Sequence, residues 1–74
     1  MKNLIGSRVR EARHKRTPII TQIDLLARLA IRGVILDSTS ISKIESHKRP
    51  VTDIELVALA DALNVNILWL LHKE

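Results

Sequence analysis

The 74-residue sequence contains no cysteine, no tyrosine and no phenylalanine, and it has only two glycines and two prolines. Without cysteine the chain can form neither disulfides nor zinc–thiolate sites, which often stabilise very small domains. Packing between helices or between subunits must therefore hold it together. A single tryptophan also provides too few aromatic platforms for RNA or single-stranded DNA to bind by base stacking, since such sites need several.

Long apolar runs are missing as well. No apolar stretch approaches the roughly 20 residues of a membrane-spanning helix, and the first residues lack the apolar block of a signal peptide, so we expect a cytoplasmic protein without a membrane partner. There is no glycine-rich phosphate loop, nucleophile elbow or pair of catalytic carboxylates, and an enzyme is not expected. The three histidines lie in different segments without partners at metal-ligand spacing, so we expect neither a metal nor another cofactor.

The residues that are present describe one folded domain over residues 1–74. The chain is 46% hydrophobic and 27% charged, which is typical of a protein with a core. Its net charge of +4 is uneven, because residues 1–49 hold 11 Lys or Arg against four acidic residues, whereas residues 50–74 hold one against four. A basic part of this kind favours a surface that faces a polyanion. Positive charge alone supports only non-specific attraction, however, and equally fits a merely soluble basic protein.

Periodic apolar residues and capping residues predict five short helices and no strands, so the fold class is all-α. The third helix begins after Asp37, whose carboxylate can accept from free amides of the next turn, and runs from Ser38 to about Ser46. The fourth is the most clearly marked, because Thr52 and Glu55 have the spacing of a capping box. The others are expected over residues 3–16 with Asn3 as N-cap, over residues 22–32 between a Thr21–Asp24 capping box and Gly33, and from Asn66 onward.

The predicted helix over residues 38–46 has two chemically different sides. With about 100° per residue, Ile41 and Ile44 share one side and must face the core, so the polar side faces outward. Serine and threonine are mediocre helix formers, and an undemanding exposed face more often carries Glu, Lys, Gln or Ala. The outward face is either ordinary solvated surface or a surface that lets the helix approach a ligand closely. It comprises Ser38, Thr39, Ser42, Lys43 and Ser46.

Arg13 and Glu45 are charged residues on otherwise apolar stripes. Arg13 lies one turn beyond Val9, and Glu45 lies one turn beyond Ile41. Removing one partner of a buried ion pair costs about 3–5 kcal/mol, so each of these charges needs a partner unless both reach solvent at the edges of their stripes. We expect a salt bridge between Arg13 and Glu45.

Five motifs follow one another in the order found in a known family. They are "REAR", "TQIDLLARL", "TSISKIESHKRP", "LVALADALNV" and "NILWLL". Over nearly its whole length the sequence resembles the Xre/Cro/phage-repressor type of helix-turn-helix DNA-binding domain. Each motif alone is weak, but five in order at nearly the family's spacing are specific. The resemblance implies a compact five-helix lambda-repressor-like helix-turn-helix bundle. It also implies a bacterial or phage regulator of transcription that binds double-stranded DNA as a homodimer and acts as a repressor.

The resemblance also implies roles for individual residues. The helix over 22–32 would cross the DNA backbone, and the helix over 38–46 would be the recognition helix in the major groove. Lys43 could donate to guanine O6 and N7, or it could rest on a phosphate and carry no sequence information. The implied sites are base contacts at Ser38, Thr39, Ser42 and Lys43, phosphate contacts at Gln22, Lys48 and Arg49, the Arg13–Glu45 pair, and a dimer interface at Ile67, Trp69 and Leu70. Trp69 would serve equally well in core packing.

The sequence departs from the family in three places, and one of them is "TPIITQ", which adds about two residues before the second helix and lacks the usual glycine there. "IRGVILDSTS" is about five residues longer than the family's tight Gly-Val-Ser turn, and the insertion must loop out or lengthen the preceding helix. His47 stands where glycine is common, so a left-handed histidine is expected to end the recognition helix. The alternative function is a protein-interaction module on the same fold, such as an antitoxin or adaptor. It would use the outward Ile23 with Ile67, Trp69 and Leu70.

Overall fold

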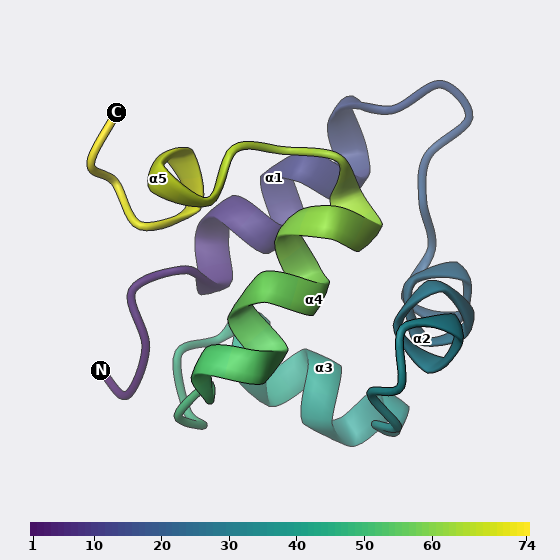
Figure 1. The fold of residues 1–74 in the computed structure, drawn as a ribbon, viewed down its shortest axis with the longest axis horizontal. Helices are drawn as coiled ribbons and strands as arrows, with labels where there is room; N and C mark the ends of the chain where they lie inside the picture. Colours follow the sequence, from purple (N-terminus) through teal and green to yellow (C-terminus); the bar gives the residue numbers. More distant parts are fainter.

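The computed structural model describes residues 1–74 and contains five helices and no strand (Figure 1). The expected all-α class is thereby confirmed. The longest helix has 11 residues, and no helix is both long and apolar enough to cross a membrane. The helices are α1 (Gly6–Lys15), α2 (Gln22–Ile31), α3 (Ser38–Glu45), α4 (Asp53–Leu63) and α5 (Ile67–Leu70).

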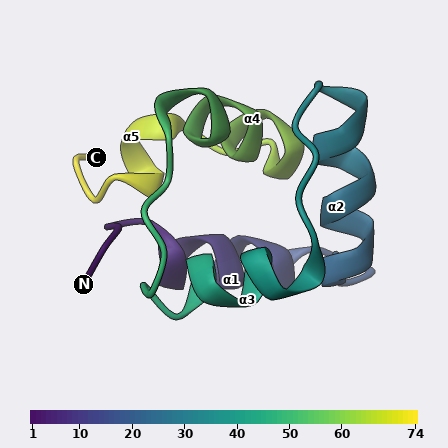
Figure 2. The same cartoon turned by 90° about the horizontal axis from the view of Figure 1, so that it is seen from below.

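The helices form two layers that α2 closes at one end. Figure 2 shows α1 and α3 side by side in one layer, α4 and α5 in the other, and α2 standing across the end of both. Both chain termini lie at the end opposite α2 (Figure 1). This arrangement leaves the outer side of α3 and the outer side of α4 on different layers of the molecule.

Three of the predicted side-chain caps begin α2, α3 and α4. The Thr21 hydroxyl accepts from the Asp24 amide, and the Asp24 carboxylate accepts from the Thr21 amide, both at 3.1 Å. Thr52 and Glu55 form the same reciprocal box at the start of α4. The Asp37 carboxylate accepts from the Ser40 amide at 2.7 Å, and this bond holds the pKa of Asp37 below its ordinary 3.8.

The start of the first helix differs from the prediction, and the end of the second decides how the long turn after it is built. The first helix begins at Gly6 with Ile5 in the N-cap position, while the Asn3 side-chain oxygen accepts from the Ile5 and Gly6 amides at 3.1 and 2.8 Å. Asn3 therefore satisfies the free amides from two residues before the cap position. The second helix ends at Ile31, and Gly33 turns the chain with φ 82°, so the extra residues before Asp37 loop out and do not lengthen α2.

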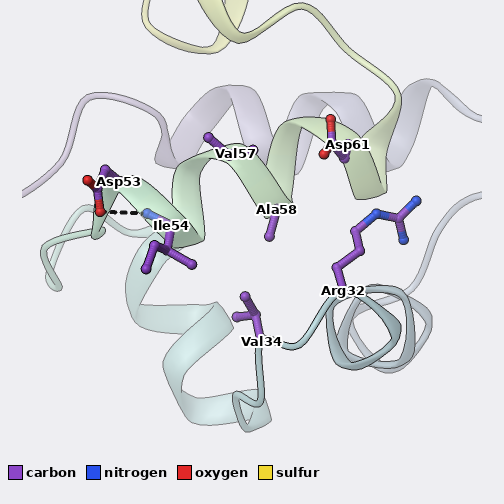
Figure 3. A pocket seen from close by; sticks show the side chains of 7 residues that line it. All are labelled: Arg32, Val34, Asp53, Ile54, Val57, Ala58 and Asp61. Atoms are coloured by element: carbon purple, nitrogen blue, oxygen red, sulfur yellow. Dashed lines mark hydrogen bonds between the residues drawn. The ribbon is translucent and has the colours of Figure 1, made fainter.

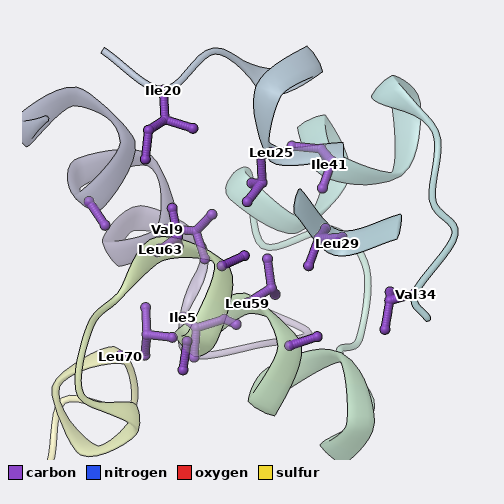
Figure 4. Close-up of a cluster of buried hydrophobic side chains, with 14 residues drawn as sticks. Ile5, Val9, Ile20, Leu25, Leu29, Val34, Ile41, Leu59, Leu63 and Leu70 are labelled. Atoms are coloured by element: carbon purple, nitrogen blue, oxygen red, sulfur yellow. The ribbon is translucent and has the colours of Figure 1, made fainter. Parts of the chain in front are cut away.

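Aliphatic side chains from all five helices form one core (Figure 4). Val34 is 7% exposed and anchors the loop between α2 and α3 to it. Leu70 anchors the short α5 in the same way and is fully buried. The largest fully buried side chains are Val9, Leu25, Leu29, Ile41, Ile44, Leu59, Leu63 and Leu70.

A glycine lets α1 approach α3 closely. A β-carbon at Gly6 would collide with the carbonyl oxygen of Ile44 and would lie 2.9 Å from the carbonyl oxygen of Glu45. Only a residue without a side chain fits there. The first turn of α1 therefore packs directly against the last turn of α3.

Candidate functional site

The outward face of α3 is polar along its whole length. Ser38, Thr39, Ser42, Lys43 and Ser46 are exposed, whereas the two isoleucines on the other side of the helix have no exposed surface. The two-sided helix predicted from the sequence is therefore confirmed. Its small side chains leave the backbone of α3 open to close approach from outside.

A buried ion pair fixes the rotation of α3 about its axis. Arg13 donates from Nε and Nη2 to the two carboxylate oxygens of Glu45, at 2.7 and 2.8 Å. Each side chain is only 7% exposed, and the third donor, Nη1, bonds the Ile20 carbonyl at 3.0 Å. The predicted salt bridge is confirmed. It ties the end of α3 to α1 and to the segment before α2, so the polar face cannot roll inward without leaving a buried charge unpaired.

Gln22, at the start of α2, lies between this ion pair and the polar face. Its amide nitrogen is 3.4 Å from a Glu45 carboxylate oxygen, and its amide oxygen accepts from the Ser42 hydroxyl at 3.4 Å. Both bonds are long and therefore weak. The half-buried Gln22 side chain is thus placed beside α3 but can exchange these contacts for a ligand.

A cleft with no hydrophobic lining joins the polar face of α3 to α1. This polar cleft has a volume of about 360 Å³. Two of its residues, Arg10 and His14, are exposed on α1 and were not singled out from the sequence. Their spacing could have revealed them, because positions 10, 13 and 14 share one side of a helix and Arg13 was already assigned to the α3 contact. The cleft is lined by Arg10, Arg13, His14, Gln22, Ser42, Glu45 and Ser46.

The segment after α3 presents one free cation rather than two. His47 ends the helix with φ 62°, as expected, and its Nδ1 lies 2.9 Å from the Asn3 carbonyl oxygen. Lys48 is exposed and forms no ion pair. Arg49 instead donates to both carboxylate oxygens of Glu55, at 2.9 and 2.8 Å. The Arg49 guanidinium holds the pKa of Glu55 below its ordinary 4.5, so the predicted phosphate contact of Arg49 would compete with this pair.

The contacts of α5 correct part of the expected dimer interface. Leu70 is completely buried within the subunit and cannot contact a partner. Trp69 is half-buried, and the cations of Arg8 and Lys15 lie 4.5 and 5.2 Å from the centre of its ring. Arg8 also donates to the Trp69 carbonyl at 2.9 Å. These residues fasten α5 to α1, and the outward side chain on this helix is Leu68, which is 48% exposed. Ile67 is half-buried as well.

No cluster of three or more His, Cys, Asp or Glu side chains could hold a metal ion.

In comparisons with known proteins, no family model, no curated protein and no solved structure matches the sequence significantly. The resemblance to helix-turn-helix repressors thus stays a prediction.

Proposed function

We propose that this chain binds double-stranded DNA with α3 in the major groove, and that it regulates transcription as a homodimer, acting as a repressor by occupying its operator. The observation that carries the proposal is the outward face of α3. Small hydroxyl side chains and one lysine cover it, and the buried Arg13–Glu45 pair holds it in place. A helix of this kind fits the major groove, which is about 12 Å wide.

The side chains on this face match the chemistry of base edges. Hydroxyl groups of Ser38, Thr39 and Ser42 can donate to or accept from bases, and the threonine methyl can meet a thymine methyl. Lys43 is exposed and can donate to guanine O6 and N7. Hydroxyl groups discriminate weakly between bases, so most of the sequence preference should depend on Lys43.

Groups beside α3 would hold the DNA backbone. Lys48 follows the helix as a free cation, and Arg10 lines the polar cleft on its other side. Gln22 stands at the amino end of α2, where amides and a side-chain amide can meet a phosphate. Cations on both sides of a groove-binding helix are the arrangement that phosphate contacts need, because phosphates line both edges of the groove.

A substitution at Lys43 tests whether α3 recognises bases. Selection of bound sequences from a random duplex pool should return a preferred site for the wild-type protein. Lys43→Ala should relax the preference at one position by about 1–3 kcal/mol, the usual value of one good base contact. Lys73→Ala, which removes a lysine from the exposed carboxy-terminal segment, serves as the control and should keep the wild-type preference.

The outcomes of this experiment are distinct. Equal weakening on every duplex would make Lys43 a phosphate contact. If the wild-type protein binds no duplex at low salt, the proposed function is wrong.

A protein-interaction module remains the second candidate, and one observation favours it. Ile23, in the first turn of α2, is 74% exposed beside the proposed DNA-facing surface. An apolar side chain there gives DNA little and could give a protein partner an anchor. If Ile23→Asn left duplex binding unchanged and abolished the binding of a purified partner protein, the module would be favoured.

A further inference from the structure

The polar cleft beside α3 contains a histidine that the proposed function leaves without a role. His14 is exposed in the last turn of α1 and lines the cleft one turn beyond Arg10. Residues four positions apart share one face of a helix, so both side chains border the same space. The cleft has no hydrophobic lining residue, and Ser42 and Ser46 form its α3 wall.

An apolar groove elsewhere on the chain is unsuited to an anion. It has a volume of about 350 Å³ and lies between α4 and the loop that follows α2 (Figure 3). Four of its seven lining residues are hydrophobic. Asp53 and Asp61 lie at opposite ends of its α4 wall, and only Arg32 supplies a positive charge (Figure 3). A phosphate would have to exchange water for apolar walls beside two carboxylates, so the polar cleft suits an anion better.

The hydrogen bond of His14 determines what its ring can offer to a ligand. Its Nδ1 lies 2.8 Å from the Arg10 carbonyl oxygen. A carbonyl oxygen can only accept, so this bond assigns the proton to Nδ1. In the neutral ring Nε2 then has a lone pair and no hydrogen, and it cannot bond a phosphate oxygen, which is also an acceptor. The protonated ring keeps the bond to Arg10, gains an Nε2–H donor and carries a positive charge.

Apart from Arg10, the charged groups that face His14 already have partners within the subunit. They are Glu11, which pairs with Lys15 at 2.7 Å, and Arg13, which pairs with Glu45 of α3 at 2.7 Å. The only residue of α2 in the cleft is the uncharged Gln22. A protonated His14 would therefore form, with Arg10, a pair of neighbouring positive charges. An anion between them would be attracted by both.

We propose that His14 is a proton-dependent phosphate contact, so that the affinity of this chain for duplex DNA rises as the pH falls. Arg10 and the protonated His14 hold one backbone phosphate at the edge of the groove that α3 enters. The inference rests on the proposed function, because the phosphate belongs to a duplex whose bases meet α3. By linkage, a ligand that favours the protonated ring takes up protons when it binds.

Duplex affinity measured by fluorescence anisotropy between pH 5.5 and pH 8 tests the inference, since histidine ordinarily changes charge within about this range. The wild-type protein should bind about tenfold more tightly at the acid end, which is the usual effect of one charge-assisted hydrogen bond. His14→Ala should bind at every pH about as weakly as the wild type does at the alkaline end. His14→Arg has a permanent charge and should bind tightly throughout. Circular dichroism would verify that the variants keep their helices.

The other two histidines supply matched controls. His72→Asn changes an exposed residue near the carboxyl terminus and should keep the wild-type pH dependence. His47 is the rival candidate, because it lies directly before Lys48 at the end of α3. His47→Asn preserves a residue type that tolerates its φ of 62° and should also keep the dependence. A dependence that survives in His14→Ala and disappears in His47→Asn would overturn the inference.

Calorimetry provides a second measurement. Titrations near pH 6.5 in buffers with different ionisation enthalpies should show that the wild type takes up protons when it binds the duplex, and that His14→Ala takes up fewer. Equal pH dependence and equal proton uptake in the two proteins would refute the role of His14 and leave the proposed function standing. A wild-type protein that binds no duplex at either end of the pH range would refute both.

Discussion

Two arginines act at the carboxyl end of α4. Arg16 donates to the carbonyls of Leu63 and Asn64 at 2.7 and 3.2 Å, and Arg28 donates to the carbonyl of Ala62 at 3.1 Å. The last carbonyls of a helix have no partner within it and carry partial negative charge. These cations therefore stabilise the carboxyl end of α4, which contains no lysine or arginine of its own.

The buried ion pair between Arg13 and Glu45 should contribute strongly to the stability of the fold. Arg13→Leu and Glu45→Leu should each lower the free energy of unfolding by about 3–5 kcal/mol, because each leaves an unpaired buried charge. The double variant should lose clearly less than the sum. Urea unfolding measures all three proteins. Glu11→Gln, which breaks the exposed Glu11–Lys15 pair, is the control and should match the wild type. Strict additivity of the two leucine substitutions would contradict the pairing.

The lowered pKa of Glu55 makes the stability of the protein depend on pH. Its pKa lies below the ordinary 4.5, chiefly because Arg49 donates to its carboxylate. The stabilisation is therefore fully present above pH 4.5 and is lost as the pH falls through the lowered value. Glu55→Gln should cost about 1 kcal/mol at neutral pH. It should cost almost nothing once wild-type Glu55 is protonated.

Urea unfolding across the acid range measures this difference. Asp24 and Asp37 also have lowered pKa values, through bonds from Thr21 and Ser40, so the variant keeps part of the acid dependence. A cost of Glu55→Gln that is equal at neutral and acid pH would show that the carboxylate charge plays no part.

At the scale of helices, local chemistry made most boundaries predictable. Thr21, Asp37 and Thr52 cap the helices that they were expected to cap, because a capping residue acts on amides two or three positions away. The start of α1 was less predictable. Asn3 acts from two residues before the N-cap position, and the close approach of Gly6 to α3 depends on a neighbour distant in the sequence.

At Gly6, helix propensity and packing predict opposite effects of a substitution by alanine. Alanine favours helices over glycine by about 1 kcal/mol, so propensity alone says that Gly6→Ala stabilises the protein. A β-carbon at this position would collide with the Ile44 carbonyl oxygen. We therefore expect Gly6→Ala to lower the free energy of unfolding by about 2 kcal/mol or more. Thermal unfolding decides between them. Ser7→Ala, at the next and exposed position of α1, is the control and should not destabilise.

At the scale of the whole molecule, the sequence predicted the all-α fold and the outward face of α3 but overstated the free positive charge. Periodicity and capping are local, and they were sufficient for the helices. Which arginines remain free depends on contacts across the fold. Arg8, Arg13 and Arg49 are used within the subunit, while Arg10 remains available beside α3. The contacts of Trp69 and the burial of Leu70 were hidden for the same reason.

The remaining free cations predict how DNA binding depends on salt. Arg10 and Lys48, the two cations proposed to contact phosphates, should together give a slope of about −2 for log affinity against log salt concentration per subunit, since each phosphate contributes about −0.9. Arg10→Ala should weaken all duplexes alike and make the slope about one unit shallower. Fluorescence anisotropy at several salt concentrations measures this. Lys73→Ala should leave the slope unchanged, and an unchanged slope for Arg10→Ala would remove Arg10 from the interface.

The contacts of Trp69 with Arg8 and Lys15 have a spectroscopic consequence. Trp69 is the only aromatic residue of the chain, so the near-ultraviolet emission of the protein comes from one place, the junction of α5 with α1. This residue does not line the polar cleft. Emission therefore reports whether α5 is docked on α1, and a ligand that fills the polar cleft without disturbing that junction should bind without a change in emission.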